Sequence, residues 1–123
     1  MIQFSGSEHE RRYNEIIRRM QNDDCYHKSL AYLLAVNDDT YRCINRVYDF
    51  DEGVIIPECL HDGWQTGHSL AVTRMAFNLW NGMCSDDDEN NNASAYTPYN
   101  LFCYTTLAPY FYEASLIRFE VIE

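Results

Sequence analysis

The segment from His68 to Asn81 would be apolar on nearly every side if it formed a helix. A helix of that kind has to be covered by other elements, so it belongs at the centre of a bundle. Thr66 or Gly67 is suited to open it, and Gly82 is well placed as its C-terminal cap. The apolar residues that set this pattern are Leu70, Ala71, Val72, Met75, Ala76, Phe77, Leu79 and Trp80.

Three earlier segments repeat apolar residues at the spacing of an amphipathic helix. Ser7 and Glu10 have the spacing of a capping box at the start of the first segment. Asp23 and Asp24 are suited to cap the second segment, which we expect to be largely buried. We predict that these helices cover about Glu8 to Gln21, Tyr26 to Ala35, and Tyr41 to Tyr48.

The rest of the chain carries signals for short elements and a loop. Val54 to Ile56 is a β-branched run before Pro57, and we expect an isolated extended segment there, not a paired strand, followed by a short helical turn. Residues 83–95 contain a run of Asp and Asn with no apolar side chain to bury, which predicts an acidic mobile loop. Thr97 and Pro98 then predict a new helix, which Pro109 interrupts or restarts.

These elements indicate an all-α fold. The chain has 123 residues, which is close to the commonest size of a single domain. Its apolar content of 46% is enough for one hydrophobic core. We therefore predict one domain over residues 1–123, built as a single compact bundle of five or six helices.

The negative charge is concentrated in the second part of the chain. Residues 1–48 carry seven Lys or Arg and seven Asp or Glu, whereas residues 49–123 carry two and twelve, which gives the net charge of −10. Such a field repels nucleic acid and anionic membranes and attracts basic protein surfaces. Direct binding of DNA or RNA is therefore the least favoured binding function. No apolar run approaches the roughly 20 residues that a membrane span needs.

Five cysteines are spread singly along the chain, at positions 25, 43, 59, 84 and 103. Their odd number and the lack of a Cys-x-x-Cys pair argue against a disulfide framework, so we expect reduced, mostly buried thiols. Residues 1–10 lack the basic and apolar pattern of a secretory signal. These absences favour a cytoplasmic protein.

Metal ligands could come from two pairs, Cys25 with His27 and Cys59 with His61. Each pair is separated by one residue within an expected helix, where the two side chains point in different directions. The glycines form no phosphate-binding loop. Ser69 lies beside His68 and Cys59 lies near His61, but neighbours in sequence rarely form a nucleophile–base contact on a helix. We therefore predict no metal site, no cofactor and no enzymatic activity.

Arg74 is one of only two basic residues in the acidic half, and it lies on the central helix one turn before Asn78. A buried arginine has to be paired, so we predict an internal salt bridge or a capped carbonyl, with Asn78 in a hydrogen-bond network. The functional alternative is a small enzyme or ligand-binding site around His61, His68 and Arg74. That alternative requires the three side chains to converge on one pocket.

Four short segments mark the chain: LAYLL at Leu30 to Leu34, WQTG at Trp64 to Gly67, AFNLWNG at Ala76 to Gly82, and YTPYNLF at Tyr96 to Phe102. In this order and in a chain of this length, they resemble a family of short uncharacterised bacterial proteins, and the resemblance covers almost the whole chain. It implies an origin in Gram-positive bacteria and their mobile elements. It supplies no catalytic residues, because none have been assigned in that family.

The function that these observations favour is a small acidic, non-enzymatic protein-binding module. Carboxylates spaced along a surface can substitute for phosphates, so the acidic half would occupy a basic, nucleic-acid-binding surface of a target protein, as a mobile-element counter-defence inhibitor of the anti-CRISPR kind does. The ordinary alternative is that the acidity only aids solubility. The predicted partner-binding residues are Asp49, Asp51, Glu52, Glu58, Asp62, Asp86, Asp87, Asp88 and Glu89.

A second hypothesis is a homo-oligomeric interaction or structural protein. Its dimer surface would be the aromatic C-terminal segment from Tyr104 to Phe119. The interface residues that we predict are Tyr104, Tyr110 and Tyr112.

Overall fold

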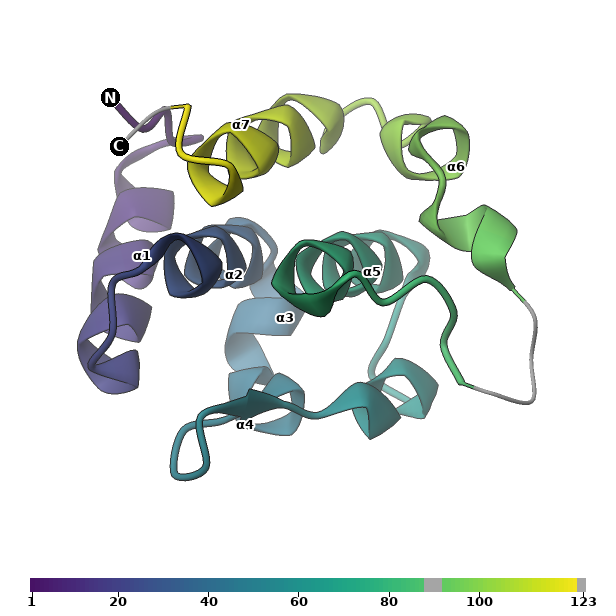
Figure 1. Cartoon of the computed structure of the whole chain (residues 1–123), viewed down its shortest axis with the longest axis horizontal. Coiled ribbons are helices and arrows are strands. Elements are labelled where there is room, and N and C mark those ends of the chain that lie inside the picture. Colours follow the sequence, from purple (N-terminus) through teal and green to yellow (C-terminus); the bar gives the residue numbers. More distant parts are fainter. Residues whose placement is uncertain (88–91, 122–123) are drawn as a thin grey trace.

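A computed structural model describes residues 1–87 and 92–121 (Figure 1). The prediction of an all-α fold is confirmed, because helices make up most of the described structure and its strands form one small hairpin. The α-helices of this part of the chain are α1 (Ser7–Met20), α2 (Cys25–Val36), α3 (Asp38–Arg42), α4 (Ile44–Val47), α5 (Gly67–Asn81), α6 (Pro98–Phe102) and α7 (Ala108–Arg118). The shorter elements are the strands β1 (Tyr48–Asp49) and β2 (Val54–Ile55) and the 3-10 helices η1 (Pro57–His61) and η2 (Ala93–Tyr96).

The core lies around α2 and α5, which run side by side in the middle of the molecule (Figure 1). Residues 29–35 of α2 are all buried, because α1, α5 and α7 pack around this helix. The predicted central helix, α5, also contributes fully buried side chains such as Phe77 and Val72. It keeps exposed or half-buried polar residues, among them His68 and Arg74, so α2 is the more enclosed of the two helices.

The predicted helix caps are confirmed at α2 and α5. The Asp24 carboxylate accepts a hydrogen bond from the His27 amide at 2.9 Å. Thr66 and Ser69 form a reciprocal capping box, and Gly82 ends α5 in the left-handed conformation at φ 78°. The predicted capping box at Ser7 is wrong, since Ser7 is already helical and Gly6 occupies the cap position without a side chain to accept a bond.

Two predicted helices are each divided, which explains why the described chain has more helices than expected. The segment predicted as one helix up to Tyr48 breaks at Cys43 into α3 and α4, and its last residue belongs to β1. The helix that begins at Pro98 ends at Phe102, and α7 begins at Ala108 with Pro109 in its first turn. Of the two predicted roles of Pro109, the structure shows the restart of the helix, because the break itself lies before this residue.

The prediction of an isolated extended segment at Val54 to Ile56 is wrong. Val54 and Ile55 pair with Tyr48 and Asp49 as an antiparallel hairpin, with Tyr48 opposite Ile55. The turn closes because Gly53 adopts φ 71° and its amide donates to the Asp49 carbonyl at 2.8 Å. The predicted helical turn after Pro57 is confirmed as η1.

The N-terminal segment is fixed to the core by a buried histidine. His9 Nδ1 accepts a hydrogen bond from the Ser5 amide at 3.0 Å, so Nε2 carries the proton that it donates to the Tyr32 carbonyl at 2.9 Å. The Tyr32 hydroxyl donates to the Gln3 carbonyl at 2.5 Å, and the Gln3 amide donates to Glu113 at 2.8 Å. Burial lowers the pKa of His9.

The cysteines are free thiols, as expected, but the prediction that most are buried is wrong. Cys59 is buried, Cys25 and Cys43 are half-buried, and Cys84 and Cys103 are exposed. The exposed pair lies in the connections after α5 and α6, where the backbone runs over the surface. No helix in the described part of the chain combines the length and apolar character that crossing a bilayer requires.

Candidate functional site

The tip of the β-hairpin presents two of the predicted partner-binding carboxylates to solvent. Asp49 Oδ1 accepts hydrogen bonds from the amides of Asp51 at 2.9 Å and Glu52 at 3.0 Å. This Asx turn uses the Asp49 side chain to fix the backbone, and the side chains of Asp51 and Glu52 are exposed. Asp49 therefore shapes the tip, whereas Asp51 and Glu52 are available to a partner.

η1 carries Glu58, and Asp62 follows it as the C-cap residue. Glu58 is exposed. Asp62 forms a two-pronged ion pair with Arg46 of α4, with both N–O distances at 3.1 Å, and it accepts from Trp64 Nε1 at 3.0 Å. The hydrogen bonds from Arg46 and Trp64 hold the pKa of Asp62 below its usual range, so this carboxylate stays ionised at neutral pH.

A groove of about 550 Å³ lies between η1 and the segment that follows α5. Its wall includes Glu58 and His61 on one side and Cys84 and Asp87 on the other. His61 Nε2 lies 3.0 Å from Asp87 Oδ2, and this contact joins the two walls. Asp87 thereby lies next to the acidic residues of η1.

Asp86, the neighbour of Asp87, points into the protein. Arg74 donates to it through Nε at 3.0 Å and Nη2 at 2.7 Å, and the Tyr96 hydroxyl donates at 2.6 Å. The carboxylate is only 8% exposed, and burial alone would raise its pKa, but bonds from Arg74, Tyr96 and Asn92 outweigh burial and lower the pKa to about 2. The predicted internal salt bridge of Arg74 is confirmed, and the Asp86 carboxylate is engaged in bonds within the protein.

The predicted mobile loop at 83–95 is anchored at both ends where the structure describes it. The Asn78 side chain donates to the Met83 carbonyl at 2.9 Å, which confirms the predicted network around Asn78. The Asp86 amide donates to Asn92 Oδ1, also at 2.9 Å. The predicted partner-binding residues Asp88 and Glu89 lie outside the described residues.

Six carboxylates of the predicted set therefore lie on the hairpin, η1 and the adjoining groove wall, at the lower side of Figure 1. We call this surface the acidic face, and its residues are Asp49, Asp51, Glu52, Glu58, Asp62 and Asp87. Among the described residues, Asp51, Glu52 and Glu58 have no ion-pair partner. Two arginines reach the face: Arg46 pairs with Asp62, and Arg19 lies over the Phe50 ring at 3.8 Å. The acidic face keeps a clear excess of negative charge.

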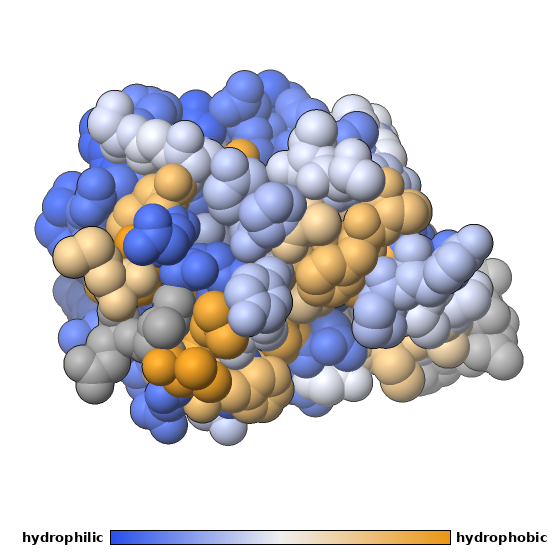
Figure 2. Space-filling view, turned by 90° about the horizontal axis from the view of Figure 1, so that it is seen from above, coloured by the Kyte–Doolittle hydropathy of each residue, from blue (hydrophilic) through white to orange (hydrophobic). Residues whose placement is uncertain are grey.

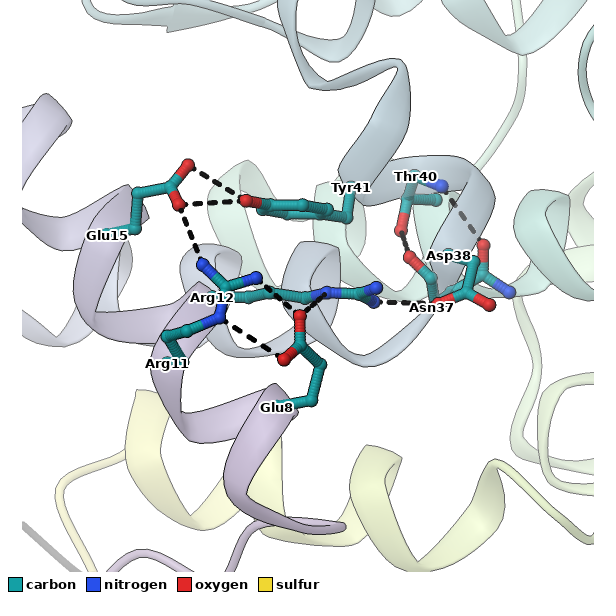
Figure 3. A network of polar contacts seen from close by, with 8 residues as sticks. All are labelled: Glu8, Arg11, Arg12, Glu15, Asn37, Asp38, Thr40 and Tyr41. Atoms are coloured by element: carbon teal, nitrogen blue, oxygen red, sulfur yellow. Dashed lines mark hydrogen bonds and ion pairs between the residues drawn. The ribbon is translucent and has the colours of Figure 1, made fainter.

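Two of the four arginines on the basic side of α1 are paired with carboxylates (Figure 3). Arg11 pairs with Glu8 and Glu15, and Arg12 pairs with Glu8 and with Asp38 of α3 at 2.8 Å. The hydrogen bond from Arg11 contributes most to the lowered pKa of Glu8. These contacts agree with the interpretation of this helix side as a solvated, partly paired surface. With Arg11 and Arg12 paired, this side of α1 offers no continuous basic patch for nucleic acid.

The three residues of the ligand-binding alternative contact different partners. His61 lines the groove beside Asp87, whereas Arg74 is held by Asp86 and lines a second hollow between α5 and α6. His68 is exposed and packs edge-on against the Tyr104 ring at 5.1 Å. No three His, Cys, Asp or Glu side chains in residues 1–87 and 92–121 are grouped so that they could hold a metal ion.

The three tyrosines of the predicted dimer surface differ in exposure. Tyr112 is 61% exposed on the outer side of α7. Tyr104 and Tyr110 are half-buried, and their rings pack against His68 and His9. Sequence reasoning missed Tyr99, which is 85% exposed; its position one residue after Pro98, at the start of a five-residue helix, was the available signal.

Comparison with known proteins gives a family without an assigned activity. No curated protein and no solved structure matches the chain significantly. The sequence profile described as "Family of unknown function (DUF6075)" matches residues 1–122, which is almost the entire chain. The expected resemblance to an uncharacterised family is thereby confirmed, and the chain belongs to the DUF6075 family.

Proposed function

We propose that this protein is a small, non-enzymatic, cytoplasmic binding module whose acidic face occupies a basic, nucleic-acid-binding surface of another protein. The observation that carries the proposal is the set of exposed, unpaired carboxylates at Asp51, Glu52 and Glu58, among the described residues, next to Asp62 and Asp87. Carboxylates held on a rigid surface can meet arginines and lysines that otherwise contact phosphates.

The fold supports this function because it separates the acidic face from most of the basic residues. Arg11 and Arg12 of α1 are engaged with Glu8, Glu15 and Asp38, away from the acidic face. Arg46 compensates one carboxylate of the face. A basic partner therefore meets net negative charge there, which speeds association and gives a binding constant that depends on salt.

In its most specific form, the proposal is a mobile-element inhibitor of bacterial defence that mimics nucleic acid. Such an inhibitor has to compete with DNA or RNA for its target, and competition is a property that can be measured directly. The partner would be captured from bacterial lysate on the immobilised protein at low salt, identified by mass spectrometry, and purified for quantitative binding. Duplex DNA or RNA is expected to displace this protein from the partner's nucleic-acid-binding surface.

The decisive variant removes three charges from the acidic face without changing side-chain size: Asp51→Asn, Glu52→Gln and Glu58→Gln. We expect the dissociation constant of the purified partner to rise at least about tenfold, since each exposed carboxylate loses its attraction for a cation. The matched control removes three charges from exposed residues elsewhere, through Glu10→Gln, Asp23→Asn and Glu120→Gln. If both triple variants weaken binding equally, net charge and not the acidic face is responsible, and the proposal fails.

A further inference from the structure

One long stretch of this acidic chain carries no charge at all. Between residues 92 and 112 there is no Asp, Glu, Lys, Arg or His, in a molecule with a net charge of −10. The next charged residue, Glu113, is buried and accepts a hydrogen bond from the Gln3 amide at 2.8 Å. The outer surface of α6 and of most of α7 is therefore uncharged up to Arg118.

That outer surface is rich in aromatic and hydroxyl side chains. Figure 2 looks onto α6 and α7 and shows pale and orange residues across much of its right half, with strongly hydrophilic residues at the top and left, in the left centre and in one place below the centre. We call this surface the uncharged face. Its exposed residues include Thr97, Tyr99, Cys103, Thr105, Pro109 and Tyr112. Depletion of charge together with exposed tyrosines is the composition of the central part of protein interfaces.

We infer that the uncharged face is the contact of a homodimer. Two copies that each carry ten excess negative charges repel one another at most relative orientations. A symmetric dimer brings the same surface of both copies together, so a surface with an excess of negative charge would meet the same excess on its partner. Among the surfaces of residues 1–87 and 92–121, the uncharged face avoids this penalty and offers large tyrosine side chains to bury.

A dimer contact of ordinary size would cover only a small share of this protein's surface. A stable interface buries about 800 Å² on each partner, which is about an eighth of the 6664 Å² surface of this protein. Tyr99 and Tyr112 are 85% and 61% exposed, so both rings can be covered by the second copy. Tyrosines in that position are among the residues that contribute most to binding.

The test is sedimentation equilibrium of the purified protein over a wide concentration range. We expect a concentration-dependent approach to twice the monomer mass of 14.5 kDa. Raising the salt to about 0.5 M should strengthen the dimer, because screening reduces the repulsion between the two acidic molecules while the uncharged contact is unaffected. A protein that remains monomeric at every concentration and salt would overturn the inference.

Two variants place a charge in the centre of the contact, Tyr112→Glu and Tyr99→Glu. Each should raise the dimer dissociation constant at least about tenfold, because a buried unpaired carboxylate has to lose its water. Val54→Glu adds the same charge at a half-exposed position of the hairpin and serves as the control, which should dimerise almost like the wild type. Circular dichroism confirms that each variant is folded, and a dimer that resists both tyrosine variants contradicts the assignment.

The homodimer and the binding of a basic partner by the acidic face are separate proposals, and each can be contradicted without the other. The triple variant Asp51→Asn, Glu52→Gln and Glu58→Gln should lose the basic partner and still dimerise. The Tyr112→Glu variant should dissociate the dimer and still bind the partner through each monomer.

Discussion

The acidic face and the uncharged face come from the same half of the sequence and lie on opposite sides of the molecule. The acidic face is built by the hairpin, η1 and the segment after α5, at the lower side of Figure 1, whereas α6 and α7 form the upper side. The net charge of residues 49–123 shows only that this half of the chain is strongly acidic. In the fold, these residues form two different surfaces, one suited to cations and one suited to a second copy of the chain.

The cluster of Arg74, Asp86 and Tyr96 lies between these two surfaces, and its loss should have the largest effect. Asp86→Asn leaves Arg74 without its buried anion, and we expect a loss of about 2 to 3 kcal/mol in the free energy of unfolding, somewhat less than for a fully enclosed pair because Arg74 is half-buried. Urea unfolding followed by circular dichroism measures this change. The control Asp51→Asn should change stability by less than about 0.5 kcal/mol. If both variants lose the same stability, Asp86 contributes no more to the fold than an exposed carboxylate does.

Salt should act on the two faces in opposite directions. From about 0.1 M to 1 M salt the screening length falls from about 10 Å to about 3 Å, so binding of a basic partner should weaken at least about tenfold. Self-association should become tighter over the same range. Parallel titrations by fluorescence anisotropy and sedimentation measure both constants, and a change of the same sign in both would break the distinction between the faces.

Mild acid should destabilise the protein through His9, whose ring packs against Tyr110 of α7, before it changes the charge of the acidic face. The folded protein lowers the pKa of His9, so the unfolded chain takes up the proton first when the pH falls below about 6.5. Stability should therefore decrease as the pH falls from about 7.5 to 5.5, with a slope of at most about 1.4 kcal/mol per pH unit.

Urea unfolding at several pH values measures this slope, and His9→Gln should flatten it. The exposed His68 gives the control, because His68→Gln should retain the slope. Asp62, whose pKa is lowered by Arg46 and Trp64, remains ionised over this range, so the acidic face keeps its charge. A slope that survives in His9→Gln would show that another group is responsible.

The smallest expected effect concerns Arg46, which compensates Asp62 within the acidic face. Arg46→Gln should tighten the binding of a basic partner about twofold, because one exposed positive charge is removed. Thermal unfolding should change little, since the arginine lies at the surface. Weaker binding in this variant would mean that Arg46 itself contacts the partner.

The sequence was most informative where a local signal acts through the backbone. Thr66 and Gly82 mark the ends of α5 by side-chain capping and by a left-handed conformation, both of which depend on residues close in the chain. The all-α class followed from apolar spacing in the same way. Arg74 was predicted to be paired because a buried cation needs an anion, and the rule requires no knowledge of the partner.

The identity of that partner depends on tertiary contacts. Asp86 belongs to a run of similar acidic residues, and only the approach of Arg74 and Tyr96 distinguishes it from Asp87. The hairpin was missed because two-residue strands have too little periodicity to detect, and Tyr48 was assigned to the end of a helix. The exposure of Tyr99 and the enclosure of Tyr104 likewise follow from how α6 meets α5.

Asp86 uses both its amide and its carboxylate, the first to bond Asn92 and the second to bond Arg74 and Tyr96. The central helix α5 and the 3-10 helix η2 are therefore held to one carboxylate. This single position couples the stability of two segments that lie far apart in the sequence.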